Sequence, residues 1–565
     1  MAAIGIGTLV VTGRLVQLQI VDHGQYAYEA RLTHISEEIL SDRRGALLDR
    51  NGYPLAASQD SFDVMVERKA WVGREDAARA AAARISEITH TPAAEMVSLV
   101  SKTDVFEVPV AKGLDYEQSV AVRRLGLSGV RLLESSRRVY PEGNLAAQLL
   151  GFVGRDQVGL SGLEADLEAI LGGTRGKLTY ERDGLGNQVA LGERRETPSQ
   201  PGANVVLTID RFIQRAAEKE LQRAIDEHKA SGGTIIVIRP QTGEILAMAS
   251  RPTADVANPD LSDESKLALF RNRAVTDTYE PGSVFKLITM AAALDLGLVS
   301  PADWWYDSGV VTLNGWSISN WDFSANGSQT VQQILSKSLN TGAAYLAQLC
   351  GPDGFYRYVD RFGFGKLTGL GLTGEAPGRV RTPESDPEWQ PVDLATNSFG
   401  QAIAVTPLQV AMALAAIAND GLAMKPYIVK EIASAAGPQV TQPEALSQAI
   451  SPDTARTLRQ MMGVVVQGVP KAYLDVQGYT IGGKTGTANI AGDNGGYKPD
   501  AYISSFVGIA PLDNPELAVL VKIDEPKTAP WGTVVAAPAF DRIVEAALPY
   551  LKVPPTEVAL VADAP

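Results

Sequence analysis

The sequence predicts a multidomain α+β protein. An elongated N-terminal pedestal is followed by a domain whose antiparallel sheet is flanked by helices and holds a helical insert. At 565 residues the chain is too long for one ordinary domain. Its 45% hydrophobic and 21% charged residues are typical of globular proteins. Strand candidates lie at both ends of the C-terminal half, with helical stretches between them, which favours one sheet covered by a helical insert.

The first twenty residues predict a membrane anchor. Ala2 to Gly13 is uncharged and largely apolar, and Arg14 interrupts the run, which ends at Ile20. A helix of about twelve residues reaches about 18 Å, whereas the hydrocarbon core of a bilayer is about 30 Å thick. We therefore interpret residues 1–20 as the outer end of an anchor whose upstream turns are missing from this sequence. An ordinary buried helix is the alternative.

Residues 21–199 are expected to form the pedestal, from short strands and helices. Arg44 to Gly52 combines an apolar strand with an Asn-Gly turn signal. Glu75 to Ile88 is rich in alanine and polar on one face, which indicates a surface helix. Pro198 to Gly202 is typical of a linker, so we place the start of the next domain at residue 202.

Residues 202–552 are expected to form the second domain. After a strand at Val205–Ile209, Asp210 is placed to cap an amphipathic helix that runs to His228. Residues 553–565 are expected to be a flexible tail. Strands are predicted at 234–238 and 244–249, joined as a hairpin by the turn at 240–243. The other elements predicted are strands at 501–509 and 517–523, and helices at 284–296, 331–349 and 407–419.

Charge and cysteine content exclude several classes of protein. The net charge of −14 argues against a nucleic-acid binder, because phosphate binding needs a concentrated positive field. Cys350 is the only cysteine, so an intrachain disulfide and a thiol metal cluster are both excluded. We expect no metal and no cofactor.

A serine and a lysine at the start of a predicted helix are candidate catalytic residues. Ser283 and Lys286 are three residues apart, so both side chains project from the same face. No histidine follows His228, so a lysine would have to act as the base. An ordinary lysine, with a pKa of about 10.4, is almost fully protonated at pH 7, so burial or a second cation must lower that pKa. Alone, Ser-x-x-Lys is a weak signal.

Ser338-Leu339-Asn340 lies inside the helical stretch 331–349. Serine and asparagine are poor helix-interior residues, so we expect them to break the helix and expose both side chains in a turn. There Ser338 could pass a proton to a leaving amine, and Asn340 could hold Lys286 or a substrate amide. Taken alone, the pattern is more typical of a polar loop between helices.

Lys484-Thr485-Gly486-Thr487 lies on a predicted glycine-rich strand. Glycine at 486 allows another backbone to approach an edge strand closely, and a peptide substrate could add itself to that edge. Lys484, with the hydroxyls of Thr485 and Thr487, offers a cation and two donors for a terminal carboxylate. Lys484 is also the candidate second cation beside Lys286. A phosphate-loop reading fails, because position 479 is tyrosine where that motif requires glycine.

The three motifs in this order resemble those of the penicillin-recognising serine acyl transferases. Further stretches resemble class B penicillin-binding proteins, and the likeness spans about Arg14 to Ile543. Glu280 and the Ser338-Leu339-Asn340 context resemble the septal, cell-division branch more than the elongation branch. The other matching stretches are 44–52, 140–143, 159–164, 208–210, 272–277, 405–409 and 524–527.

The resemblance implies a DD-transpeptidase that cross-links peptidoglycan stem peptides and is inhibited by β-lactams. Ser283 would be the nucleophile and Lys286 the base, with the backbone N–H groups of Ser283 and Thr487 as the oxyanion hole. Lys484, Thr485 and Thr487 would bind the donor carboxylate. The implied location is the bacterial cell membrane, single-pass, with an extracytoplasmic catalytic domain. The implied partners are the cytoplasmic membrane, divisome proteins and a SEDS-type glycosyltransferase.

Other classes of protein share some of these motifs. A class A β-lactamase needs a Glu-x-x-Leu-Asn deacylation motif, which is absent between Asn340 and Lys484. A bifunctional class A penicillin-binding protein would carry a Glu-Asp glycosyltransferase signature, and Glu75-Asp76 lacks its context. An elongation-type enzyme, or an inactive penicillin-binding scaffold or sensor, stays open.

Overall fold

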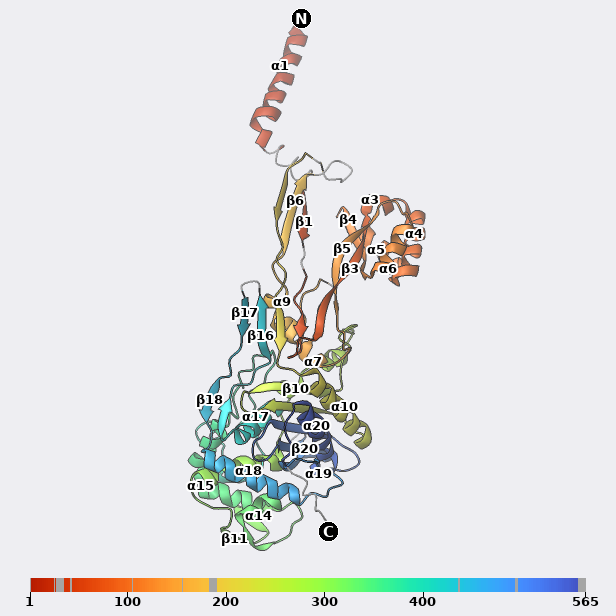
Figure 1. Cartoon of the computed structure of the whole chain (residues 1–565). Helices are drawn as coiled ribbons and strands as arrows, with labels where there is room; N and C mark the ends of the chain where they lie inside the picture. The colour runs from red at the N-terminus through yellow and green to blue at the C-terminus, as the bar shows by residue number, and fades with distance from the viewer. Residues whose placement is uncertain are drawn as a thin grey trace, which may run out of the picture. The chain divides into compact units, whose positions relative to one another are not determined.

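The computed structural model divides the chain into two compact units (Figure 1). The N-terminal unit holds residues 1–46, 57–139 and 169–203, and the C-terminal unit holds 47–56, 140–168 and 204–565. The residues that the structure describes are 2–24, 26, 35–40, 43–103, 105–154, 156–181, 189, 191–434, 437–492 and 496–556.

Within the predicted pedestal, residues 21–199, the segment 140–168 belongs to the C-terminal unit. Residues 140–168 pack on the C-terminal unit, where the carboxylate of Glu218 accepts a hydrogen bond of 2.7 Å from the backbone N–H of Ala146. The rings of Phe152 and Phe270 also lie 4.5 Å apart. Through these contacts residues 140–168 belong to the C-terminal unit, and the local sequence pattern does not reveal them.

The N-terminal unit contains two sheets. Strands β1 (Ile35–Leu40), β6 (Gly176–Glu181) and β7 (Arg194–Thr197) form one antiparallel sheet in that order. In the other, residues 57–67 of β3 (Pro54–Glu67) pair with β4 (Glu107–Leu114) and β5 (Val130–Val139). Its apolar core includes Ala82 and Ile85 of α4, and the helices of this part are α3 (Arg68–Trp71), α4 (Glu75–Thr89), α5 (Ala93–Lys102) and α6 (Tyr116–Arg124).

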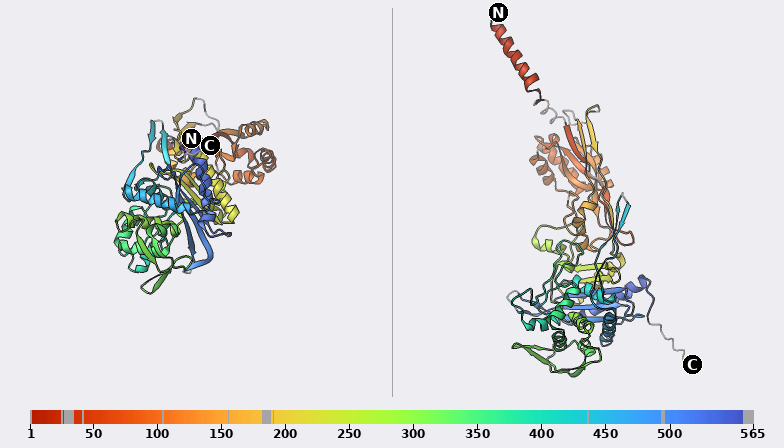
Figure 2. Two further views of the ribbon diagram at one scale, coloured as in Figure 1. Left: turned by 60° about the horizontal axis from the view of Figure 1, so that its bottom comes forward. Right: turned by 90° about the vertical axis from the view of Figure 1, so that its left-hand side faces the viewer.

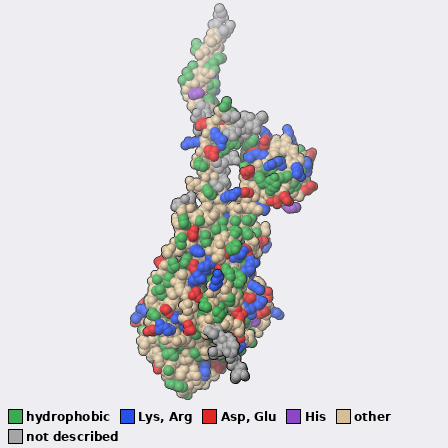
Figure 3. All heavy atoms as spheres, in the orientation of Figure 1, with side chains coloured by type: hydrophobic (Ala, Val, Ile, Leu, Met, Phe, Trp, Pro, Cys, Tyr) green, Lys and Arg blue, Asp and Glu red, His purple; other side chains and the backbone are tan. Residues whose placement is uncertain are grey.

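The N-terminal helix α1 (Ala2–Val16) runs into a π-helical turn at Gln17–Val21. Its apolar side chains from Ile6 to Val16 face solvent, and Figure 3 shows several of them along the helix. Within the described part of the chain, no helix has the length and apolar character needed to cross a bilayer.

The C-terminal unit is organised around a five-stranded antiparallel sheet. Its order is β10 (Glu244–Arg251), β9 (Gly232–Arg239), β21 (Leu517–Asp524), β20 (Tyr497–Ala510) and β19 (Gly482–Ala491). The strands predicted at 234–238, 244–249, 501–509 and 517–523 are therefore present, and β9 and β10 pair as the predicted hairpin. Strand β19 lies at the edge of the sheet.

Two helices cover the sheet with a shared apolar core, α10 (Arg211–His228) and α20 (Ala537–Tyr550). Asp210 caps α10 as predicted, since its carboxylate accepts hydrogen bonds from the N–H groups of Phe212 and Ile213. Phe506 of β20 and Phe540 of α20 are fully buried in this core, with ring centroids 4.9 Å apart.

The helical insert lies beside the blue C-terminal strands in both views of Figure 2. The predicted helix 331–349 is broken as expected, into α14 (Val331–Ser336) and α15 (Asn340–Arg361). The predicted helix 284–296 starts with a 3₁₀ turn at Gly282–Phe285 and continues as α13 (Lys286–Asp295). Helices α17 (Pro407–Ala418) and α18 (Pro452–Gln467) complete the insert.

Two antiparallel strand pairs inside the insert were not predicted: β11 (Trp304–Asp307) with β14 (Gly327–Thr330), and β12 (Val310–Leu313) with β13 (Trp316–Ser319). The remaining elements of the C-terminal unit are β2 (Leu47–Leu48), α7 (Ala147–Leu150), α8 (Gly162–Asp166), β8 (Asn204–Leu207), α11 (Glu264–Leu267), α12 (Arg273–Thr276), α16 (Pro391–Asn397), β15 (Leu422–Met424), β16 (Val429–Ser434), β17 (Gly437–Val440), β18 (Ala445–Gln448) and α19 (Gly532–Val535).

The predicted flexible tail, residues 553–565, begins too early. The carbonyl oxygen of Val553 accepts a 2.8 Å hydrogen bond from the Tyr479 hydroxyl, and the N–H of Thr556 donates to the Gly478 carbonyl at 2.9 Å. These bonds fix residues 553–556 to the body of the unit. Residues 557–565 lie outside the described residues.

Phe540→Ala tests the role of the shared core. Removing a fully buried ring leaves a cavity, so we expect the free energy of unfolding to fall by about 3–5 kcal/mol. Urea unfolding followed by tryptophan fluorescence measures the change. Leu446→Ala, at an exposed position on β18, is the control and should change stability by less than about 0.5 kcal/mol. Equal stability of the two variants would contradict this description of the core.

Candidate active site

Ser283 lies in the 3₁₀ turn Gly282–Phe285, directly before α13. Side chains three residues apart are eclipsed in a 3₁₀ turn, so Ser283 and Lys286 point the same way. The Ser283 Oγ is 3.1 Å from the Lys286 Nζ. The predicted pairing of these two side chains is therefore present, although the turn is tighter than the α-helical turn expected.

Two glycines let the serine turn touch strand β19. Gly282 has a φ of +61°, and a Cβ there would lie 2.8 Å from the carbonyl oxygen of Thr487. A Cβ at Gly486 would lie 2.3 Å from the Ser505 hydroxyl and 3.1 Å from the carbonyl oxygen of Pro281. The close approach predicted at Gly486 is thus made by the serine turn of the chain itself.

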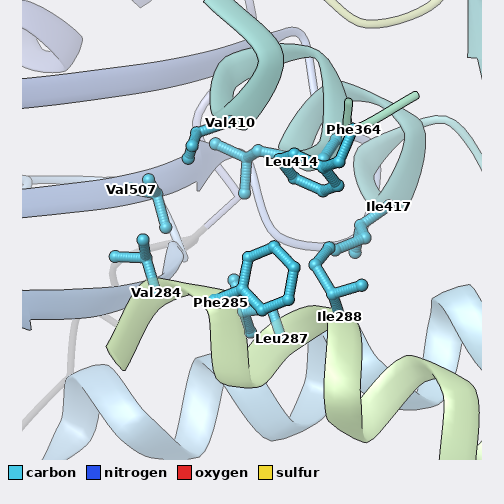
Figure 4. A pocket seen from close by; sticks show the side chains of 10 residues that line it. Val284, Phe285, Leu287, Ile288, Phe364, Val410, Leu414, Ile417 and Val507 are labelled. Atoms are coloured by element: carbon cyan, nitrogen blue, oxygen red, sulfur yellow. The ribbon is translucent and has the colours of Figure 1, made fainter. Parts of the chain in front are cut away.

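Apolar packing holds the other side of the serine turn (Figure 4). The side chains of Phe285 and Ile288 point into a small space of about 10 Å³, which is too small and too apolar to hold an ordered water. The space is also lined by Val284, Phe364, Val410, Leu414, Ile417 and Val507. The turn is therefore packed against an apolar core on this side.

The Lys286 side chain is buried among oxygen atoms. Its Nζ lies 2.6 Å from the carbonyl oxygen of Ser338 and 2.8 Å from the Oδ1 of Asn340, and both atoms are acceptors only. It also lies 3.2 Å from the Ser338 Oγ. A neutral amine has two hydrogens and one lone pair. With both hydrogens on those two acceptors, the lone pair is left for a hydroxyl.

Lys484 reaches the same place from strand β19. Its Nζ donates to the Ser338 Oγ at 2.9 Å and to the carbonyl oxygen of Thr485 at 3.0 Å. The Ser338 hydroxyl therefore lies between the two amines. The lysines are only 2% and 1% exposed, so neither ammonium group would keep its hydration.

Burial lowers the pKa of both lysines, because it removes water from the charged form. For Lys484 burial lowers the pKa to about 7. For Lys286 burial, followed by repulsion from Lys484, lowers the pKa well below its ordinary value. Repulsion from Lys484 adds to burial only at Lys286, which favours the neutral amine at Lys286 while Lys484 is protonated in part near pH 7.

The break between α14 and α15 presents Ser338 and Asn340 to these amines. Ser338 has a φ of +57°, which interrupts the helix, and Asn340 is the first residue of α15. The Nδ2 of Asn340 donates to the carbonyl oxygen of Ser319 at 3.1 Å, which turns its Oδ1 toward Lys286. Sequence reasoning missed Ser319, and no local pattern marks a residue that acts through its carbonyl group.

The two threonines of the third motif differ in their surroundings. The Thr487 hydroxyl donates to the carbonyl oxygen of Pro530 at 3.2 Å, so its proton is already engaged. The structure records no such bond for the Thr485 hydroxyl within the described residues. Both residues alternate with the buried Lys484 and Gly486 along β19 and are partly exposed. Of the two, Thr485 is better placed to donate to an incoming anion.

The eight candidate residues named from the sequence lie together in the C-terminal unit. No group of three or more histidine, cysteine, aspartate or glutamate side chains suited to a metal ion occurs among residues that the structure describes.

Comparison with known families decides the relationship. The penicillin-binding protein transpeptidase domain matches residues 233–545, and the penicillin-binding protein dimerisation domain matches residues 40–207. The chain belongs to the class B penicillin-binding proteins. The resemblance predicted from the three motifs is thus confirmed.

Several class B relatives align over nearly the whole chain. Stage V sporulation protein D of Bacillus subtilis is 34% identical over 94% of this chain and 83% of the relative. Penicillin-binding protein PbpB of Mycolicibacterium smegmatis is 32% identical over 94% of this chain and 85% of the relative. Peptidoglycan D,D-transpeptidase FtsI of Escherichia coli is 29% identical over 96% of this chain and 90% of the relative.

Solved class B structures share the fold. Penicillin-binding protein 3 of Mycobacterium tuberculosis, complexed with aztreonam, has a TM-score of 0.70 at 28% identity and covers 92% of this chain and 98% of its own. A peptidoglycan synthetase of Bifidobacterium adolescentis has a TM-score of 0.74 at 27% identity, covering 93% and 98%. The predicted multidomain α+β architecture is confirmed.

Lys484→Met tests the electrostatics of this class B site through stability. The native chain loses stability at low pH because it must bury a charged Lys484, and this penalty disappears as pH rises from about 7, the pKa of Lys484 in the folded protein, to 10.5, its ordinary value. The gain in the free energy of unfolding from Lys484→Met should therefore be largest below pH 7 and shrink toward pH 10.

Urea unfolding at a series of pH values measures this difference. Lys471→Met, at an exposed lysine, is the matched control and should show no such pH dependence. A constant difference between Lys484→Met and the native chain from pH 6 to pH 10 would show that the pKa of Lys484 is not lowered.

Proposed function

We propose that this protein is a serine D,D-transpeptidase that cross-links peptidoglycan stem peptides through an acyl-enzyme on Ser283. The observation that carries the proposal is the distance of 3.1 Å between the Ser283 Oγ and the Nζ of a buried lysine whose pKa is strongly lowered. Relatives named peptidoglycan D,D-transpeptidase, which align over nearly the whole chain, support the same reaction.

Acylation starts with proton transfer from Ser283 to Lys286. The lone pair of the neutral amine takes the hydroxyl proton while the Oγ attacks the carbonyl carbon of the penultimate D-alanine. The negative charge that develops on the carbonyl oxygen is stabilised by the backbone N–H groups of Ser283 and Thr487. The contact between Gly282 and the Thr487 carbonyl supports this placement, because it keeps the serine turn and β19 together.

Release of D-alanine requires that a proton reach its nitrogen as the C–N bond breaks. The Ser338 hydroxyl lies 3.2 Å from Lys286 and 2.9 Å from Lys484, so it is placed to donate its own proton and take one from a lysine. The acyl group is then transferred to an amine of a neighbouring stem peptide. The proton that this amine loses passes through the Ser338 hydroxyl and a lysine to the Oγ of Ser283, which is released as a hydroxyl. Protons and charges balance over the full cycle.

The donor carboxylate is proposed to bind at β19. Lys484, protonated in part near pH 7, supplies the positive charge, and the Thr485 hydroxyl supplies a hydrogen bond. Thr487 contributes its backbone N–H, since its hydroxyl is engaged with Pro530. The carboxylate of a β-lactam would occupy the same place. Because β19 is an edge strand, the substrate backbone can also pair with it along its open side.

Septal cell-wall synthesis is the proposed role of this activity. Support comes from the Glu280 and Ser338-Leu339-Asn340 patterns and from the FtsI relatives. We also propose that the exposed apolar side chains of α1 attach the chain to the cytoplasmic membrane, as part of a single-pass anchor, with the catalytic domain outside. Divisome proteins and a SEDS-type glycosyltransferase are the proposed partners.

Ser283→Ala tests the nucleophile. Without the hydroxyl no acyl-enzyme can form, so covalent labelling by a fluorescent penicillin should be abolished, whereas the native label should persist for many minutes. Gel fluorescence measures the label, and circular dichroism checks the fold. Ser336→Ala, at an exposed serine of α14, should label like the native chain. Residual labelling of Ser283→Ala would show that the nucleophile is another residue.

Imaging tests the septal role. A fluorescently tagged copy expressed in its own host should concentrate at midcell during division, because septal synthesis occurs there. The tagged Ser283→Ala variant controls for effects of activity on placement. Uniform signal along the side wall would instead favour an elongation-type enzyme.

A further inference from the structure

Asp307, at the end of β11, is a fully buried carboxylate close to the active site in the fold. Its Oδ1 accepts hydrogen bonds from the Gly309 N–H at 2.9 Å and the Thr341 hydroxyl at 2.8 Å. Its Oδ2 accepts from the Asn320 Nδ2 at 2.9 Å and from the Asn326 N–H and Nδ2 at 3.1 and 2.8 Å. Five donors converge on one carboxylate, and no salt bridge to it is recorded among the described residues.

These hydrogen bonds favour the ionised form of Asp307 although its carboxylate is buried. Burial alone would raise its pKa, but the hydrogen bonds from Gly309, Asn326 and Thr341 together hold the pKa of the Asp307 carboxyl below its ordinary value. A buried carboxylate that is charged without a cation is expensive, and here hydrogen bonds to both of its oxygens offset that cost.

Asn320 connects this carboxylate to helix α15. Its Nδ2 is held by Asp307, so its Oδ1 faces the opposite way and accepts from the backbone N–H groups of Asn340 at 3.0 Å and Thr341 at 3.3 Å. The N-cap residue of α15, Leu339, has no side chain that can satisfy these groups. Asn320 therefore acts as the cap of α15, and Asp307 sets its orientation.

The same helix end carries the side chain that holds the catalytic amine. Asn340 is the first residue of α15, and its Oδ1 lies 2.8 Å from the Lys286 Nζ. Its Nδ2 bonds to Ser319, the residue next to Asn320, so the backbone N–H and the side-chain Nδ2 of Asn340 both bond to the same segment. A continuous chain of hydrogen bonds thus runs from Asp307 through Asn320 and Asn340 to Lys286.

We propose that Asp307 is a positioning residue of the transpeptidation site, acting through Asn320 to fix the first turn of α15 and so aim Asn340 at Lys286. It touches neither the substrate nor the reacting atoms. The inference rests on the proposed function of Lys286 as the base. It adds one residue to those that the reaction needs, thirty-three residues before Asn340 and outside the three motifs.

Asp307→Asn is the main test, because an amide keeps the shape but places an N–H group against donors. We expect the second-order rate constant for acylation by a fluorescent penicillin to fall about 10- to 100-fold, as small misplacements of catalytic groups do. Solvent that enters around Lys286 should raise its pKa, so the acid limb of the pH–rate profile should move to higher pH. Loss of stability alone would not move that limb in folded protein.

Asn326→Ala is the matched control. Asn326 also donates to Asp307, but the structure records no bond from it to α15, so its loss should leave the acylation rate within about twofold and the acid limb in place. If Asp307→Asn fails to fold, Asn320→Ala tests the same chain, because it retains the carboxylate and removes only the connection to α15.

The outcomes separate the two claims. Native-like rate and pH profile in folded Asp307→Asn or Asn320→Ala would overturn the positioning role while leaving the transpeptidase intact. Absence of acylation in the native chain would instead overturn the proposed function. A loss of rate in Asn326→Ala equal to that in Asp307→Asn would show that the whole loop, and not the connection to α15, matters.

Discussion

The active site depends on the burial of two lysine side chains on either side of the Ser338 hydroxyl. The Nζ atoms of Lys286 and Lys484 lie 3.2 and 2.9 Å from the Ser338 Oγ. Two ammonium groups cannot both stay charged there, because each has lost its water and each repels the other. Burial and repulsion from Lys484 lower the pKa of Lys286 well below its ordinary value, which favours the neutral amine that could activate a serine without an imidazole.

Three separate segments of the chain bring these side chains together. The serine turn is the 3₁₀ turn Gly282–Phe285, and Lys286 begins α13. Lys484 comes from the edge strand β19, and Ser338 with Asn340 from the break between α14 and α15. Contact between the turn and β19 requires glycine at 282 and 486, since a Cβ at either position would overlap neighbouring atoms. The apolar side chains packed against the turn, among them Phe285 and Phe364, then keep it in contact with β19.

The sequence predicted the parts whose chemistry is local. The cap at Asp210, the hairpin of β9 and β10, the helix break at Ser338 and the three motifs all follow from short-range patterns. The contacts of residues 140–168 could not be predicted, because their partners, such as Glu218 and Phe270, are distant in sequence. Asp307, Ser319 and Asn320 were missed for the same reason: their roles exist only once β11 and β13 meet α15.

The protonation state of Lys286 tests the account most directly. With lysines labelled at Cε with ¹³C, the Lys286 signal is assigned by its absence in Lys286→Met and followed by NMR from pH 5 to pH 11. We predict that Lys286 is already neutral at pH 7, and that Lys484→Met raises its pKa or leaves it unchanged without lowering it further. A Lys286 signal that titrates near 10.5, as for an ordinary lysine, would contradict the account.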